Sequence, residues 1–138
     1  MNAVGRITDL TIAVSRMLCS GHLTRFDGLA LVASTGGGAL PFSVGRLARN
    51  HAAFPKLVVD PMPEFERLYF DSIVFQSDAL NYLVDKVGAE KVMLGSDYPF
   101  PIGDPTPRRV IEMGGFGAHE TSLMLGGVAE RLFNLERS

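Results

Sequence analysis

The chain has 138 residues, 46% of them hydrophobic and 20% charged, which excludes disordered and fibrous proteins and is typical of one soluble domain. Its 13 Lys and Arg against 15 Asp and Glu give a net charge of −2, so we expect neither a nucleic-acid nor a membrane partner. The single cysteine, Cys19, cannot form an internal disulfide, and no secretory leader or membrane span is recognisable. Together these features predict a cytoplasmic protein.

The first half of the chain is predicted to alternate helix and strand. Apolar residues within 7–18 recur with a 3.6-residue period, which predicts an amphipathic helix. The uninterrupted apolar run 29–33 predicts a strand covered on both faces, and a turn rich in glycine follows it. A second helix is predicted over 41–50, because a proline stands in its first turn. Three prolines predict that 51–66 is irregular.

The second half continues the same alternation of elements. We expect, in order, a strand over 68–75, a helix over 78–87 capped by Ser77, a strand over 91–94 and helices over 107–113 and 119–134. Such an order favours an α/β fold with a parallel sheet and right-handed crossovers, formed by a single segment spanning 1–138. A complete (β/α)₈ barrel needs about 250 residues, so this chain cannot close one alone.

Asp97 is the first candidate for a functional role. It follows an apolar strand and precedes Tyr98 and Pro99, so its carboxylate is expected at the carboxyl end of the sheet. A carboxylate in that place can bind a metal ion or accept a proton from a metal-bound water. The alternative, of equal weight on spacing alone, is an aspartate that caps the following loop.

The remaining candidates are less specific. The triplet 36–38 could approach a phosphate or carboxylate closely, but a tight strand-to-helix turn explains it as well. Arg46 could bind a substrate carboxylate through its guanidinium group, although most helix arginines are simply solvated. His22, His51 and His119 show no pair at metal-ligand spacing, so we do not expect them to bind metal.

Three segments together resemble a known family. They are Tyr-Phe-Asp-Ser at 69–72, Val-Met-Leu-Gly-Ser-Asp-Tyr-Pro-Phe-Pro at 92–101, and Gly-Gly-Gly-Ala-Leu-Pro-Phe-Ser-Val-Gly-Arg at 36–46. This set resembles the amidohydrolase-related family that includes 2-amino-3-carboxymuconate 6-semialdehyde decarboxylase, and the match extends over nearly the whole chain. The resemblance implies a partial TIM (β/α)₈ barrel, namely about the last three βα units of a metal-dependent barrel.

The resemblance also implies a function. Family members hold a divalent metal, usually zinc, with an H-x-H pair, further histidines and a final aspartate, and Asp97 matches that aspartate as the catalytic and metal-binding residue. Arg46 matches an arginine that reaches across a dimer interface to a substrate carboxylate, and Phe100 matches an aromatic residue beside the substrate. The implied enzyme is a decarboxylase or hydrolase of small carboxylated aromatic or muconate-type substrates, and the choice between the two reactions stays open.

The chain departs from the family pattern at several positions. Thr35 stands where the family has a histidine, and Gly127-Val128-Ala129 replaces the usual Gly-Asn-Ala. The H-x-H pair would lie upstream of Met1. We therefore expect a fragment that is inactive alone, and whether it binds a metal by itself stays open. The alternative is a non-catalytic module that assembles with itself as a homo-oligomer or with a separately encoded N-terminal half-barrel.

Overall fold

The computed structural model describes residues 3–135, which divide into two compact units. Unit 1 contains the described residues up to Ala33 together with Gly37–Leu68, and unit 2 contains Ser34–Gly36 and the described residues from Tyr69 onward. No helix within 3–135 is both long and apolar enough to cross a lipid bilayer.

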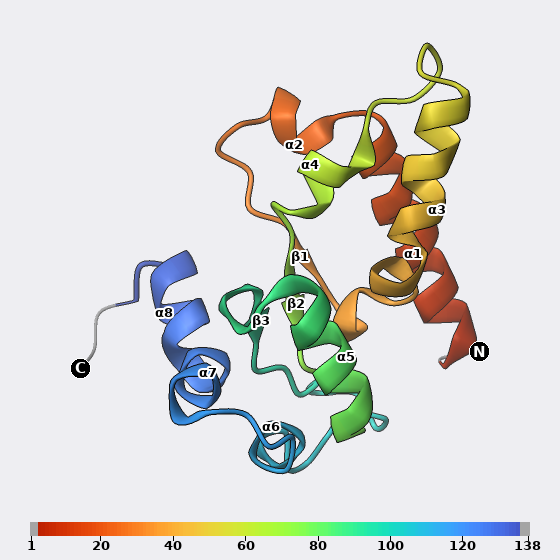
Figure 1. Ribbon diagram of the computed structural model, residues 1–138. Coiled ribbons are helices and arrows are strands. Elements are labelled where there is room, and N and C mark those ends of the chain that lie inside the picture. The colour runs from red at the N-terminus through yellow and green to blue at the C-terminus, as the bar shows by residue number, and fades with distance from the viewer. Residues whose placement is uncertain (1–2, 136–138) are drawn as a thin grey trace. The chain divides into compact units, whose positions relative to one another are not determined.

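Unit 1 is mainly helical (Figure 1). Its elements are α1 (Val4–Cys19), α2 (His22–Arg25), β1 (Val32–Ala33), α3 (Leu40–Ala53) and α4 (Pro61–Phe65). The predicted helices over 7–18 and 41–50 are confirmed and are each a few residues longer than expected. The predicted strand over 29–33 is only two residues long. The core of unit 1 contains fully buried leucines from three of the helices, namely Leu18, Leu23 and Leu40.

Helix α4 corrects the prediction that 51–66 is irregular. The Asp60 side chain caps the helix by accepting a hydrogen bond of 3.0 Å from the Met62 amide. Pro61 occupies the first helical position, where the missing amide proton costs nothing and the fixed φ suits a helix. The prolines that suggested a loop therefore begin a helix here.

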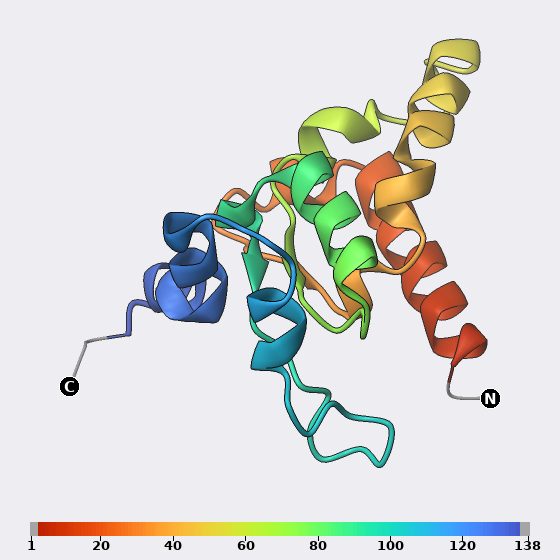
Figure 2. The same cartoon turned by 60° about the horizontal axis from the view of Figure 1, so that its bottom comes forward.

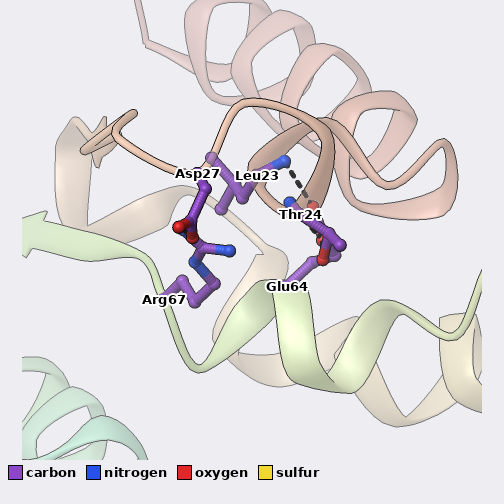
Figure 3. Close-up of polar contacts among 5 residues, drawn as sticks. All are labelled: Leu23, Thr24, Asp27, Glu64 and Arg67. Atoms are coloured by element: carbon purple, nitrogen blue, oxygen red, sulfur yellow. Dashed lines mark hydrogen bonds and ion pairs between the residues drawn. The ribbon is translucent and has the colours of Figure 1, made fainter.

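Glu64 on α4 ties this helix to α2 (Figure 3). Its side chain is 1% exposed and accepts hydrogen bonds from the amides of Leu23, at 2.7 Å, and Thr24, at 2.8 Å, and from the Thr24 hydroxyl. Burial raises the pKa of this carboxyl, but these hydrogen bonds and the charge of Arg67 outweigh burial and lower it. Glu64 thus holds two separate helices together as an ionised, fully hydrogen-bonded group.

Unit 2 is the α/β part of the chain. Its elements are β2 (Tyr69–Asp71), α5 (Ser77–Val87), β3 (Val92–Met93), α6 (Arg108–Glu112), α7 (Ala118–Ser122) and α8 (Val128–Leu132). Strands β2 and β3 pair in parallel, with Phe70 opposite Val92 and Asp71 opposite Met93. All four residues are buried, as expected for strands covered on both faces. The predicted α/β class and parallel pairing are confirmed.

Two predictions in unit 2 need correction. Ser77 was expected to cap α5, but the capping position is occupied by Gln76, whose side chain makes no capping hydrogen bond. The Ser77 hydroxyl donates instead to the Val110 carbonyl oxygen at 3.4 Å. The single helix expected over 119–134 is divided, because a π-helical turn at Leu123–Gly127 separates α7 from α8. Two adjacent glycines end this turn, and glycine weakens a regular helix.

A long loop joins β3 to α6 and projects from the rest of unit 2 (Figure 2). It is held at its base by the Asp104 amide, which donates a hydrogen bond of 2.8 Å to the Ser96 carbonyl. The Phe100 amide donates to the Asp97 carbonyl at 3.0 Å, which makes a turn inside the loop. The loop carries two of the three predicted site residues, Asp97 and Phe100.

Candidate functional site

The candidate site lies in unit 2, where β2 and β3 end. Because parallel strands end at the same edge of a sheet, Asp71 at the end of β2 and Asp97 after β3 are brought to the same edge. Asp97 is half-buried and has a left-handed backbone, with φ 59°. Among residues 3–135 its carboxylate receives neither a hydrogen bond nor an ion pair. Instead the Ser96 hydroxyl accepts from the Tyr98 amide at 3.3 Å, so Ser96 rather than Asp97 caps this loop.

Asp71 is the best-connected polar group of the site. Its two carboxylate oxygens accept hydrogen bonds from the amides of Gly36 at 2.8 Å, Thr35 at 3.0 Å and Ile73 at 3.1 Å. Burial raises the pKa of Asp71, the three amide hydrogen bonds lower it, and the negative charge of Asp97 raises it further, so the net shift is upward. Asp71 and Asp97 are therefore close enough to interact electrostatically, and the Asp71 carboxylate already accepts hydrogen bonds from backbone amides.

The turn that Asp71 holds has an unusual backbone. Thr35, Gly36, Gly37 and Gly38 all have positive φ, with 54° at Thr35 and 60° at Gly36. Only glycine adopts this region without strain, and threonine, which is branched at Cβ, is especially unsuited to it. A Cβ added to Gly36 would lie 2.5 Å from Cγ1 of Val74, so the chain also approaches its neighbour too closely for a side chain.

A second glycine allows close approach on the other side of Asp71. The Gly95 amide donates to the Ser72 hydroxyl at 3.2 Å. A Cβ at Gly95 would lie 2.8 Å from the Ile73 side chain and 3.0 Å from Cβ of Asp71. The segment leading to Asp97 is thus pressed directly against the end of β2.

The structure distributes the predicted site residues between the two units. Asp97 and Phe100 share the loop after β3, and Phe100 is half exposed. Arg46 lies on α3 in unit 1 and is exposed. Sequence reasoning missed Asp71 as a member of the site. The signal that could have found it was an acidic residue directly after the apolar pair Tyr69 and Phe70, in the strand next to the one that leads to Asp97.

The described residues do not make up a metal site. Within 3–135, no three or more His, Cys, Asp and Glu side chains come together in a way that could hold a metal ion. His22 Nδ1 lies 2.7 Å from the Ser20 hydroxyl, and His51 Nδ1 lies 2.8 Å from the Val58 carbonyl oxygen. His119 is exposed on α7. Asp97 by itself offers a single carboxylate ligand, so no catalytic step through a metal follows from these residues.

Comparison with known proteins places the chain in a family. The amidohydrolase family model matches residues 4–135, and the chain belongs to this family. Over 139 aligned positions it is 34% identical to the 2-amino-3-carboxymuconate-6-semialdehyde decarboxylase of Dictyostelium discoideum. This alignment covers 96% of the chain but 39% of that relative, so the chain spans about two-fifths of the relative's length.

Solved structures give the same result for the fold. The 5-carboxyvanillate decarboxylase of Sphingomonas paucimobilis is 31% identical, with a TM-score of 0.76 over 89% of this chain and 39% of its own. The dihydroxybenzoic acid decarboxylase of a Polaromonas species, solved with bound manganese and the inhibitor 2-nitroresorcinol, has a TM-score of 0.80 at 20% identity. It is matched over 93% of this chain and 40% of its own. The α/β fold is thus consistent with part of an amidohydrolase-type barrel.

Proposed function

We propose that this chain forms about the last three βα units of a TIM barrel and supplies the Asp97 carboxylate to a divalent-metal site. The reaction is decarboxylation, with hydrolysis as the alternative, of a small carboxylated aromatic or muconate-type substrate. The observation that carries the proposal is the state of Asp97. This residue is half-buried after a strand end, has a positive φ, and its carboxylate accepts no hydrogen bond from residues 3–135. Membership of the amidohydrolase family and similarity to two kinds of decarboxylase support it.

Two further residues would contact the substrate. Arg46 carries a guanidinium group, which can bind a carboxylate through two parallel hydrogen bonds, and it is exposed on α3. Phe100 is 51% exposed in the same loop as Asp97, and its ring offers an apolar face to an aromatic or conjugated substrate. These roles come from the positions that match the family's pattern.

The metal would need ligands from outside this chain. Zinc and manganese both accept carboxylate and imidazole ligands, and a carboxylate alone binds either weakly. Since residues 3–135 hold no cluster of three ligands, we propose that the chain alone is inactive. The other ligands would come from the part of the barrel that these residues do not span, and a complete site would need both parts.

Metal content and carbon dioxide release test the proposal together. The purified chain is incubated with Mn²⁺ or Zn²⁺, desalted and analysed by elemental mass spectrometry beside Asp97→Asn. We expect less than stoichiometric metal in both proteins, and no release of carbon dioxide from 5-carboxyvanillate. Weak Mn²⁺ binding to the unaltered chain, measured by calorimetry, should disappear in Asp97→Asn. Stoichiometric metal retained by both proteins would overturn the role of Asp97.

A second candidate function is assembly without catalysis. Several large apolar side chains of unit 2 are exposed, namely Phe75, Tyr98, Phe100, Ile102 and Met113. Such surface commonly becomes buried when chains associate. We propose a homo-oligomer or a complex with a partner half-barrel, and sedimentation velocity tests the first. A chain that stays monomeric at all concentrations would exclude self-association.

A further inference from the structure

We propose that Asp71 is a positioning residue, which fixes the backbone of Thr35 and Gly36 against the end of β2 and so determines where the Thr35 hydroxyl stands. This role in a reaction rests on the function proposed above. The contacts themselves do not depend on it, because all of them lie within unit 2.

The carboxylate of Asp71 divides its contacts between two segments of chain. Oδ2 accepts from the Thr35 amide at 3.0 Å, while Oδ1 accepts from the amides of Gly36 at 2.8 Å and Ile73 at 3.1 Å. Ile73 follows β2, whereas Thr35 and Gly36 are more than thirty residues earlier in the chain. One side chain therefore fastens a distant turn to the end of the strand that carries it.

The conformation of the turn explains why such a fastening is needed. A threonine with φ 54° is strained, because its branched Cβ meets the backbone in the left-handed region. Strained residues persist only where surrounding contacts hold them, and they gather at functional sites. Among the described residues the Thr35 amide donates its hydrogen bond to Asp71, so this carboxylate, together with the 3-10 turn Thr35–Gly37, holds Thr35 in place.

The charge arrangement argues against a purely structural role. Asp71 is 7% exposed and the negative charge of Asp97 acts on it, so burying the ionised Asp71 carboxylate is electrostatically unfavourable. A fold that needed only to form this turn could do so without the electrostatic cost of a buried carboxylate. Meanwhile Thr35 is half-buried, and its hydroxyl has no hydrogen-bond partner within 3–135. It is a polar group free to bind a substrate or a water molecule.

Asp71→Asn is the variant that separates these contacts. The asparagine oxygen can replace Oδ1 and keep the bonds to Gly36 and Ile73, but its NH₂ group would face the Thr35 amide, donor against donor. We expect hydrogen exchange at the Thr35 amide, followed by NMR, to become about tenfold faster or more. Exchange at Ile73 should change much less, and the three-bond HN–Hα coupling of Thr35 should show that its φ has changed.

Glu64→Gln is the matched control. It makes the same chemical change at another buried carboxylate that accepts backbone amides, but in unit 1. Its effect on exchange should appear at Leu23 and Thr24 and leave Thr35 unchanged. Equal exchange at Thr35 in the unaltered chain and in Asp71→Asn would overturn the proposal.

A measurement on the unaltered chain keeps the proposal testable if Asp71→Asn does not fold. Scalar coupling across the hydrogen bond between the Thr35 nitrogen and the Asp71 carboxyl carbon should be observable by NMR. Its absence, with the coupling between Glu64 and Leu23 present, would overturn the assignment of Asp71.

Mn²⁺ alone serves as the probe that separates this inference from the proposed function. In the unaltered chain, Mn²⁺ bound at Asp97 should broaden the amide signals of Asp97 and Thr35. In Asp71→Asn the broadening at Asp97 should remain, and that at Thr35 should change. Unchanged broadening of both would contradict positioning by Asp71. If Mn²⁺ broadens neither in the unaltered chain, the metal role of Asp97 fails, and the exchange result still decides the role of Asp71.

Discussion

Glu64 in unit 1 and Asp71 in unit 2 are both buried carboxylates that accept three hydrogen bonds. All three at Glu64, and two of the three at Asp71, come from segments distant in the sequence. Their pKa values nevertheless shift in opposite directions. Burial raises both, but at Glu64 the Thr24 hydroxyl, two amides and the charge of Arg67 reverse this effect. At Asp71 three amides do not reverse it, and the charge of Asp97 adds to it.

The difference shows that the surroundings of Glu64 favour an ionised carboxylate, whereas the surroundings of Asp71 do not. The surroundings of Glu64 favour its ionised form, so its hydrogen bonds contribute fully to the stability of unit 1. The surroundings of Asp71 oppose ionisation, so part of the same kind of hydrogen bonding is offset. Proteins tolerate such a cost mostly at sites where a particular geometry is needed.

Truncation of the two carboxylates gives the largest expected effects. Glu64→Ala leaves the buried Leu23 amide without its partner and removes the acceptor of the Thr24 amide and hydroxyl, and we expect it to lower the free energy of unfolding by about 3 kcal/mol. Asp71→Ala should cost about 1 to 2 kcal/mol, because it also removes an unfavourable buried charge. Urea denaturation measures both losses. Glu66→Ala, which removes an exposed carboxylate directly after α4, is the control and should have little effect. Equal losses would break the comparison.

Gly36→Ala tests the tightness of the turn beside Asp71. The alanine Cβ would meet Val74 at 2.5 Å and would also require φ 60° of a residue that avoids it. We expect a loss of about 2 kcal/mol in thermal or chemical unfolding. Gly28→Ala is the matched control in unit 1, because a Cβ there meets no atom within 4 Å. Similar stability of the two variants would show that the turn is loose.

The pH dependence of stability tests whether Glu64 stabilises the folded chain in its ionised form. Its folded pKa lies below the ordinary value of 4.5, so the unfolded chain takes up the proton more readily than the folded chain. The stabilisation is therefore fully present above pH 4.5 and is lost as the pH falls through the folded pKa. Arg67, which pairs with Asp27, is the charged neighbour involved. Glu64→Gln should remove this acid-dependent loss, as unfolding at a series of pH values would show.

The smallest effect is expected at the ion pair next to Glu64. Arg67 and Asp27 are 3.1 Å apart, but the Asp27 side chain is 97% exposed (Figure 3). Exposed pairs are screened by water, so Asp27→Ala should change the unfolding free energy by less than about 0.5 kcal/mol. A loss comparable to that of Glu64→Ala would mean that the two contacts act as one network.

Local patterns were enough to predict many features of this protein. Apolar periodicity predicted α1, α3 and α5, because burial of a helix face repeats at a fixed spacing. Apolar, β-branched and aromatic residues predicted the positions of β2 and β3, because such side chains favour a buried strand. The residues of 36–46 and 92–101 were enough to indicate the amidohydrolase family, which the family model confirms over 4–135. The position of Asp97 after an apolar strand was likewise visible.

Other features were decided only by the tertiary structure. Glu64 bonds to Leu23 across 41 residues and Asp71 to Thr35 across 36, and such distant hydrogen bonds leave no periodic signal in the sequence. Strand β3 proved short because the amide of Leu94, directly after it, donates a hydrogen bond to the Met124 carbonyl instead of to a neighbouring strand. The sequence by itself determined the order of most helices and strands and the family to which the chain belongs. Which acidic side chains meet which amides, and hence which carboxyl pKa rises and which falls, depends on segments that only folding brings together.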